Sequence, residues 1–283
     1  PLMYLFEDKN GKKQVVDGRQ RISAILDFLE GKFKLNNLRI LKQFNGCCFA
    51  DLDLKQQGVI EDFQLLFYII QPPTPERVKY DIFDRVNRGG TPLNKQEMRN
   101  ALYRGRCTRM LDKLCCSPEF LIATGRSINK ERMKDQYVVL RAMAFLMLHR
   151  GEFKDIPALQ YRGDIDDFLA RFMVYVNDNA PEKLIVDYEN LFIRCMQISY
   201  DLLGENGFRF SGNGIRRPIN MPLFEALSYL FSFVPEKIDY TWASRLILDI
   251  ESVKEEFDGS RYFSGNIDST TSVSFRFDRM DKI

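Results

Sequence analysis

The sequence predicts an α+β fold, with a small mixed unit of strands and helices in front of a larger, mostly helical part. Three observations predict this fold. Apolar runs typical of strands, bounded by turn residues, recur through residues 1–71. A proline-rich break, PPTP, follows at 72–75. Beyond it, apolar residues recur at helical spacing. We therefore predict two domains, 1–105 and 106–283.

The composition is that of an ordinary globular chain. Of its 283 residues, 45% are apolar and 28% are charged. The formal net charge is +2. Residues 1–105 hold 17 Lys and Arg against 13 Asp and Glu, and the remainder holds 24 against 26. The chain thus lacks the whole-molecule basic field typical of many nucleic-acid-binding domains.

Several classes of protein are excluded by the cysteines, the histidine and the apolar runs. None of the six cysteines forms a C-x-x-C motif, so neither a disulfide framework nor a zinc site is predicted. The single His149 cannot supply a histidine-based nuclease centre. The longest apolar run, 137–148, contains Arg141 and is too short to span a bilayer. It reads as a helix buried nearly all round. We expect a cytoplasmic protein with no membrane contact.

The first elements follow a strand–turn–strand–helix pattern. Residues 2–6 and 13–17 read as strands joined by an Asn-Gly turn. Apolar residues at helical spacing predict a helix through 22–29, and Gly31 stands where a helix usually ends. The stretches KFKL and RILKQFNGCCFADL predict further hairpin strands around Asn45-Gly46. A short helix near 54–62 and a strand at 63–71 complete this part.

The rest of the chain reads as helix after helix. Thr74 is expected to cap a helix that ends at NRGG (87–90), and Thr91 or Asn94 to cap the next one. Further helices are expected near 107–115, 131–149, 164–178, 181–203, 221–233 and 240–257.

The stretch DGRQR is the first candidate site. Asp17 and Gly18 stand between a strand and a helix whose unpaired N–H groups attract anions. One of Arg19 and Arg21 would clamp a phosphate while the other braces an acidic neighbour. Asp17 would hold Mg²⁺ or position a water. The alternative interpretation is that Asp17 merely caps the helix and the arginines are solvated.

The stretch NRGG is the second candidate. Asn87, Arg88, Gly89 and Gly90 form a corner rich in hydrogen-bond donors that suits an anion. The alternative is that the paired glycines only terminate a helix. If both stretches bind one ligand, Arg21 and Asn87 should line one cleft, because one helix N-terminus neutralises only part of a triphosphate's charge.

Taken together, the two stretches resemble the family of the N-terminal domain of GmrSD-type modification-dependent restriction endonucleases, whose D-G-Q-Q-R site is of the ParB/sulfiredoxin-like group. Arg19 stands where that family usually has a glutamine, which adds affinity for phosphate. The segment 216–227, RRPINMPLFEAL, is also similar to the family's later helical part. The matching residues are Asp17, Gly18, Gln20, Arg21, Phe83, Asn87, Gly89, Gly90, Pro92, Leu93 and Glu97.

The resemblance implies a ParB-like unit packed on the helical part, in a DNA restriction or anti-phage defence system, that binds and hydrolyses a nucleoside triphosphate with Mg²⁺. In this hypothesis Asp17, Gln20 and Arg21 are catalytic and Asp17 also binds the metal. Gly18, Arg19 and residues 87–90 bind the nucleotide. DNA is the expected partner, and a nuclease of the His-Asn-His kind would lie in a separate domain or subunit. Two alternatives stay open: a sensor of DNA or nucleotide without turnover, and direct metal-dependent DNA cleavage at the same site.

Three further stretches carry weaker signals. The basic loop 208–220 places Arg216 and Arg217 near a helix that Asn220 would cap, and they either contact DNA phosphate or are solvated. RGDIDDF (162–168) reads as an acidic helix start. Residues 264–280 carry hydroxyls ahead of two arginines and are a candidate to fold back on the first domain.

Overall fold

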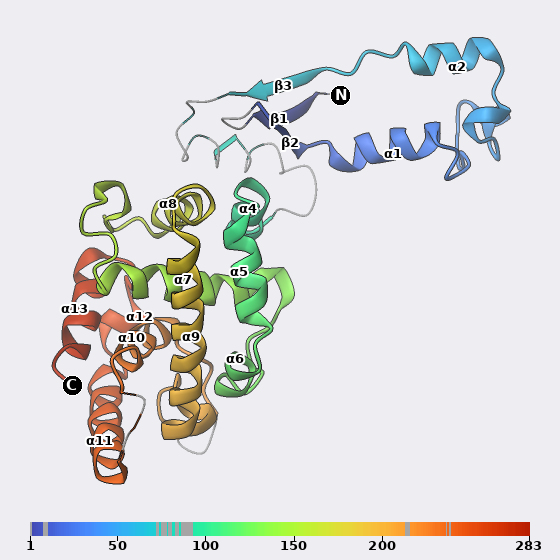
Figure 1. The fold of residues 1–283 in the computed structure, drawn as a ribbon. Helices are drawn as coiled ribbons and strands as arrows, with labels where there is room; N and C mark the ends of the chain where they lie inside the picture. Colours follow the sequence, from blue (N-terminus) through green and yellow to red (C-terminus); the bar gives the residue numbers. More distant parts are fainter. Residues whose placement is uncertain are drawn as a thin grey trace. The chain divides into compact units, whose positions relative to one another are not determined.

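The structure is a computed structural model. Contacts within the chain divide it into two compact units, Pro1–Pro92 and Leu93–Ile283 (Figure 1). The residues that the structure describes are 2–7, 11–71, 74, 78, 81–82, 85, 93–212, 216–235, 237 and 239–283.

The first unit is built on a three-stranded sheet in the order β2-β1-β3. β1 pairs with β2 antiparallel and with β3 parallel. Tyr4 lies opposite Asp17 where the register of the first pair shifts. In Figure 1, α1 leads away from the sheet and the chain returns to β3 through α2. Its elements are β1 (Met3–Glu7), β2 (Lys13–Asp17), α1 (Arg19–Leu29), η1 (Lys42–Phe44), η2 (Phe49–Asp51), α2 (Leu54–Glu61) and β3 (Phe67–Ile70).

Most of the predicted elements of this unit are confirmed. The strands expected at 2–6, 13–17 and 63–71 and the helix near 54–62 are present. α1 ends where expected, and Gly31 has a positive φ of 73° and donates its N–H to Phe28 O.

The hairpin predicted around Asn45-Gly46 is wrong. The chain forms the two short 3₁₀ helices η1 and η2 there. The Asn45 side chain accepts a hydrogen bond from Leu38 N and donates one to Leu38 O. Backbone bonds join Leu35 to Gly46 and Cys47, but these few bonds do not extend into a strand ladder.

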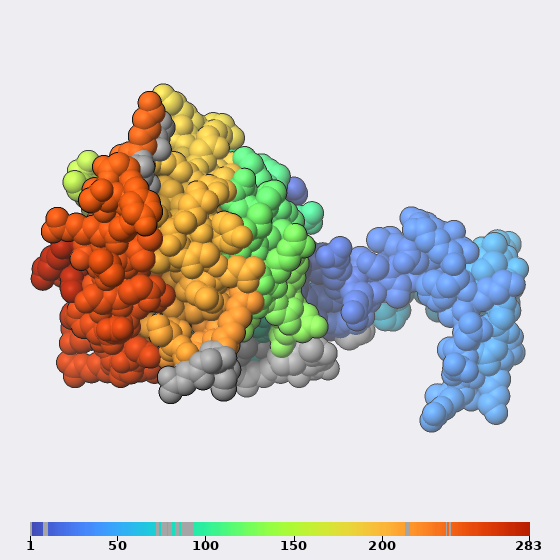
Figure 2. Space-filling view, turned by 90° about the horizontal axis from the view of Figure 1, so that it is seen from below, coloured from blue at the N-terminus to red at the C-terminus, as the bar shows by residue number. Residues whose placement is uncertain are grey.

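The second unit is helical. α10 is buried along its whole length and contacts α7, α9 and α13. α9 and α11 pack side by side on the face shown in Figure 2. Its elements are α4 (Lys95–Leu102), α5 (Arg106–Cys115), α6 (Pro118–Ala123), η4 (Glu131–Met133), α7 (Lys134–His149), η5 (Pro157–Leu159), α8 (Ile165–Asp178), α9 (Glu182–Leu203), η6 (Gly204–Asn206), α10 (Met221–Phe231), α11 (Tyr240–Phe257), α12 (Arg261–Ser264) and α13 (Thr270–Met280).

All six helices expected from residue 107 onward are present. The predicted caps Asn94 and Asn220 accept hydrogen bonds from the first turns of α4 and α10, and Asp164 likewise caps α8 in the expected acidic helix start. The helices α6, α12 and α13 were not predicted from the sequence. α13 lies within the segment 264–280 and packs on α10 and α12 of the second unit.

A buried ionic network crosses the centre of the second unit. Glu225 of α10 has no exposed surface and accepts hydrogen bonds from Arg141 of α7 and Arg276 of α13. Arg141 also pairs with Asp268 at 2.7 Å. Three helices are therefore joined through one carboxylate.

These elements confirm the predicted α+β fold with a mostly helical remainder. Within the part of the chain that the structure describes, no strand falls between residues 131 and 257. Nor is any described helix long and apolar enough to cross a membrane. The domain boundary at 105 and 106 stays a prediction. In the structure, α4 belongs to the second unit.

Candidate functional site

The candidate site begins at Asp17, the last residue of β2. The Asp17 carboxylate is partly exposed and its Oδ2 pairs with Nη2 of Arg21, one helical turn further on. Arg21 Nη1 also donates to Leu2 O at 3.2 Å. Arg21 thus ties the start of α1 to the end of β2 and to the residue before β1. Of the two arginines, Arg21 is the one that braces the acidic neighbour.

Gly18 turns the chain sharply between Asp17 and α1. Its backbone is left-handed, with φ 97° and ψ 4°. A Cβ at this position would lie 2.5 Å from Cγ and 2.8 Å from Sδ of Met3. Both the backbone conformation and the contact with Met3 therefore require glycine here.

Among the residues that the structure describes, no group accepts a hydrogen bond from the first backbone amides of α1. Gly18 occupies the N-cap position, no side chain caps the helix, and the first turn has no acidic residue. Ile22 N–H is the first to bond within the helix, to Gly18 O at 2.8 Å. The amides of Arg19, Gln20 and Arg21 thus keep the partial positive charge that attracts anions. The interpretation of Asp17 as a simple cap is wrong, since its carboxylate pairs with Arg21.

Two side chains on this first turn point to solvent. Arg19 and Gln20 are exposed. Among the described residues, neither forms a side-chain hydrogen bond or ion pair. Arg19 is therefore available as a charged donor beside the free amides of the helix start.

The residues present fit Mg²⁺ only as partial ligands. Asp17 Oδ1 accepts no hydrogen bond from the residues that the structure describes, so it is open to a cation. No group of three or more His, Cys, Asp or Glu side chains in the described ranges could hold a metal ion. Mg²⁺ commonly takes one or two carboxylates and completes its shell with substrate phosphates and water. Asp17 suits that role.

The second candidate, Asn87, Arg88, Gly89 and Gly90, lies outside the described residues. Its role in binding and the cleft shared by Arg21 and Asn87 stay predictions. Glu97, which the family motif also includes, is described. It closes a capping box with Asn94 and pairs with Arg132 at 2.9 Å. The hydrogen bond from Arg132 lowers the pKa of Glu97. Both contacts of Glu97 are structural.

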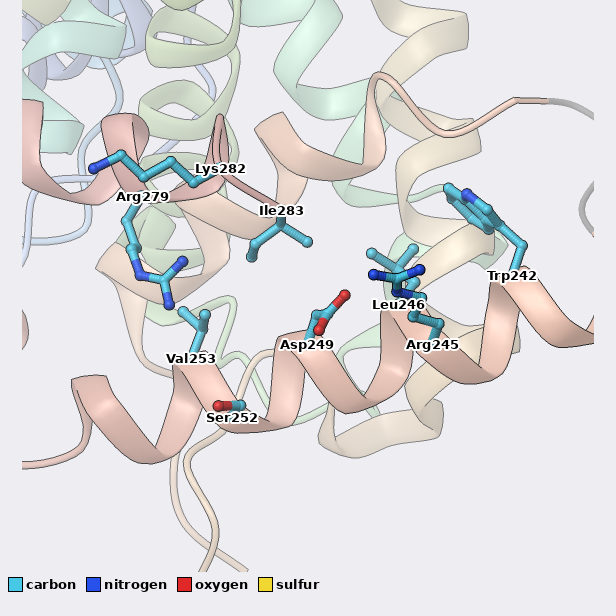
Figure 3. Close-up of a pocket in the computed structure, with 9 residues that line it drawn as sticks. All are labelled: Trp242, Arg245, Leu246, Asp249, Ser252, Val253, Arg279, Lys282 and Ile283. Carbon is cyan, nitrogen blue, oxygen red and sulfur yellow. The ribbon is translucent and has the colours of Figure 1, made fainter.

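A hollow of about 420 Å³ in the second unit was not predicted from the sequence. Figure 3 shows the lining residues of α11, from Trp242 to Val253, along one side, with Ile283 opposite Asp249 and Arg279 opposite Val253. Arg279 bonds Glu256 Oε2 through Nε and Nη2, at 3.1 and 2.9 Å. Arg245 is exposed. The hollow thus holds no buried cation, and we do not count it as a candidate site.

Sequence reasoning also missed two residues that shape the site in the first unit. Met3 forces the glycine at position 18, and Leu2 supplies the carbonyl that holds Arg21. Neither residue type signals such a role. Their positions follow only from the pairing of β1 with β2, which brings Tyr4 opposite Asp17.

Comparison with known proteins identifies the first part of the chain. Residues 1–104 match the model of the family described as the GmrSD restriction endonuclease, N-terminal domain. No curated protein and no solved structure matches the chain. The similarity expected for 216–227 lies beyond the matched range and stays a prediction. The matched range includes DGRQR, so residues 1–104 are similar to the N-terminal domain of the GmrSD restriction endonuclease, and this similarity supports a role in DNA restriction or defence.

Proposed function

We propose that the start of α1 binds the phosphates of a nucleoside triphosphate with Mg²⁺ and that the chain hydrolyses this nucleotide as part of a DNA restriction or defence system. The observation that carries the proposal is the uncapped start of α1, which three free amides and the exposed Arg19 surround. Such a helix start attracts phosphate oxygens through both its donors and its dipole.

Each residue of DGRQR then has a role. Gly18 adopts the left-handed turn that places the free amides of α1 directly after Asp17. Arg19 and the Gln20 amide donate to phosphate oxygens. Arg21 holds the Asp17 carboxylate in position through their ion pair. The Asp17 oxygen left open would bind Mg²⁺, and the metal would neutralise charge on the phosphates.

Hydrolysis needs few reactive groups of its own. Water attacks the terminal phosphorus, the bond to the bridging oxygen breaks, and the nucleoside diphosphate and inorganic phosphate leave. Positioning and charge neutralisation account for most catalysis of phosphoryl transfer. Donors that hold the phosphates at a fixed place therefore suffice for this activity, provided that a cation shares the charge.

The test is release of phosphate from each of the four ribonucleoside triphosphates with Mg²⁺, with and without DNA. We expect Asp17→Ala to abolish turnover while the protein stays folded, because a partly exposed ion pair contributes only about 0–1 kcal/mol to stability. Asp27→Ala is the matched control. Asp27 lies on the same helix and pairs with Lys32, away from the helix start. Unchanged turnover in folded Asp17→Ala would contradict the assigned role.

Arg19→Gln, which restores the residue usual in the family, is expected to preserve or raise turnover at saturating nucleotide. Loss of the charged donor should raise KM. Two other outcomes would replace the proposal. Tight nucleotide binding without phosphate release would favour a sensor, and metal-dependent nicking of plasmid DNA that Asp17→Ala abolishes would favour a nuclease at this site.

A further inference from the structure

A second hollow, of about 720 Å³, lies in the second unit beside η6 and α11. Ligand pockets commonly enclose roughly 300–1,000 Å³. The positive side chains that line this hollow outnumber the negative ones by four to two. The charged lining residues are Arg209, Arg216, Arg217, Lys254, Glu205 and Glu251.

Three of the four cations have a carboxylate partner. Arg216 pairs with Glu205 at 2.6 Å, and Lys254 pairs with Glu251 at 2.8 Å. Arg217 pairs with Asp258, which lies outside the lining. Counting Asp258 with Glu205 and Glu251, the four cations still exceed the carboxylates by one positive charge.

Arg209 is the cation without such a partner. Its side chain is 4% exposed. The guanidinium donates to Thr124 O at 3.1 Å, to Glu205 O at 3.2 Å, and to Arg217 O and Ser127 Oγ. All four acceptors are neutral. Within the described residues, no carboxylate binds Arg209 directly.

A buried cation held only by neutral acceptors is costly, because burial removes its hydration and no carboxylate bonded to it directly replaces that hydration. Burial, and to a lesser extent the nearby charge of Arg216, lowers the pKa of Arg209, while Glu205 acts in the opposite direction. Arginine nevertheless stays charged in proteins. An anion that entered the hollow would find one positive charge already in place and unmatched.

The turn beside Arg209 has a glycine, Gly125, where the Arg216 side chain lies against it. The turn at 124–127 is held by Arg209 through Thr124 and Ser127. Gly125 in this turn has φ 58°, and a Cβ there would collide with Nη2 of Arg216. The absence of a side chain at Gly125 lets the Arg216 guanidinium lie against the turn, where it lines the hollow.

We propose that this hollow binds a phosphate group, with Arg209 as the buried charge and Arg216 and Arg217 as the exposed forks that close on it. Guanidinium forks match phosphate oxygens in a bidentate manner, and the negative charge of a phosphate offsets the positive excess of the hollow. The phosphate belongs either to a DNA backbone or to a free nucleotide. The proposal concerns a different unit from the start of α1 and does not rest on nucleotide hydrolysis there.

The test measures binding of inorganic phosphate, ATP and a short DNA duplex to the full chain by calorimetric titration. Arg19→Ala is present and Mg²⁺ is absent in every sample, so that binding at the start of α1 is weakened equally throughout and any further loss reports on the hollow. Arg216→Gln combined with Arg217→Gln should weaken binding by about 10-fold or more, since two charge-assisted hydrogen bonds are lost. These side chains are partly exposed, so the double variant should fold, whereas an Arg209 variant also removes the tie to the 124–127 turn.

Arg132→Gln is the control, because Arg132 is similarly exposed, pairs with Glu97 and does not line the hollow. If the double variant binds only DNA more weakly, the hollow binds a phosphate of the DNA backbone. If it binds ATP or inorganic phosphate more weakly, the hollow binds a free phosphate group. Either result supports the proposal. Unchanged binding of all three probes, no binding by the parent chain, or an equal loss in Arg132→Gln would overturn it.

Discussion

The unit 1–92 and the unit 93–283 differ in how much apolar surface they bury. In the described part of the first unit, only Met3, Phe28 and Leu52 are buried apolar side chains. Large apolar residues stay exposed there, among them Ile40 at 92% and Leu54 at 86%. All other described apolar side chains that are buried lie in the second unit, where α10 is buried on every face.

This difference separates two tasks. Burial of apolar surface is the main favourable term in folding, so the second unit should hold most of the stability of the chain. Ligand-binding segments are commonly drawn from the less stable parts of proteins. The start of α1 carries free backbone donors and a required glycine in the unit with the smaller core. We infer that the second unit acts as the stable body and the first as the reactive part.

Among the substitutions that test the difference in stability between the two units, Glu225→Gln is expected to lower the free energy of unfolding most. The substitution leaves the buried guanidinium groups of Arg141 and Arg276 without their shared carboxylate. Removing one partner of a buried ion pair costs about 3–5 kcal/mol. Urea unfolding followed by circular dichroism should show that loss for the helical unit. Glu256→Gln, which breaks the more exposed pair with Arg279, should cost about 1 kcal/mol or less. Equal losses in the two variants would refute a central role for the network.

The second largest effect is expected from acid, which should lower the stability of the second unit through His149. His149 stacks on Phe277 with ring centroids 3.6 Å apart, and burial lowers its pKa from 6.5 to about 4. Asp281 opposes that shift and Arg276 adds to it. Below pH 6.5 the unfolded chain binds a proton that the folded chain does not, so stability falls as the pH falls toward 4.

The expected loss between pH 6.5 and 4 is about 3 kcal/mol. His149→Phe replaces the ring with one that does not titrate, so the difference between variant and parent isolates this residue from the carboxylates. The free energy of unfolding, measured at several pH values, should fall less steeply in the variant. Parallel curves for the two proteins would rule out the histidine as the cause.

The smallest effect is expected in the first unit, from Gly18→Ala. The added Cβ meets Met3, and alanine disfavours the positive φ, so the cost should be about 1–3 kcal/mol. Because that unit has few buried contacts, the loss should appear as faster amide exchange in β1, β2 and α1 alone. Gly11→Ala is a suitable comparison, since it shares a positive φ but has nothing within 4 Å. Faster exchange throughout the helical unit would show that the two units are not separate in stability.

Local signals explain how much of the fold could be predicted. Helices such as α9 and α11 carry clear apolar spacing, and Asn94, Asp164 and Asn220 are typical caps. The hairpin at Asn45-Gly46 was wrong because 3₁₀ helices form on both sides of it and the Asn45 side chain bonds the backbone of Leu38, a contact that propensity does not show.

The candidate site was predictable in type but not in its partners. The sequence indicates an anion site at DGRQR, yet only strand pairing reveals that Met3 contacts Gly18 and that Arg21, not Arg19, holds Asp17. Arg209 and Lys254 were missed altogether. They come from separate elements, and the burial of Arg209 without a bonded carboxylate is a property of the fold rather than of any local stretch.

Amide hydrogen exchange of the full chain, with Mg²⁺ and with ATP or GTP added in turn, tests the central claim most directly. Without nucleotide, α7, α9 and α10 should exchange far more slowly than β1, β2 and α1. With nucleotide, we predict that the amides of Arg19, Gln20 and Arg21 gain protection and that Arg19→Ala reduces the gain. Unchanged exchange at these three amides with every nucleotide, at concentrations that slow exchange elsewhere in the chain, would contradict a phosphate site at the start of α1.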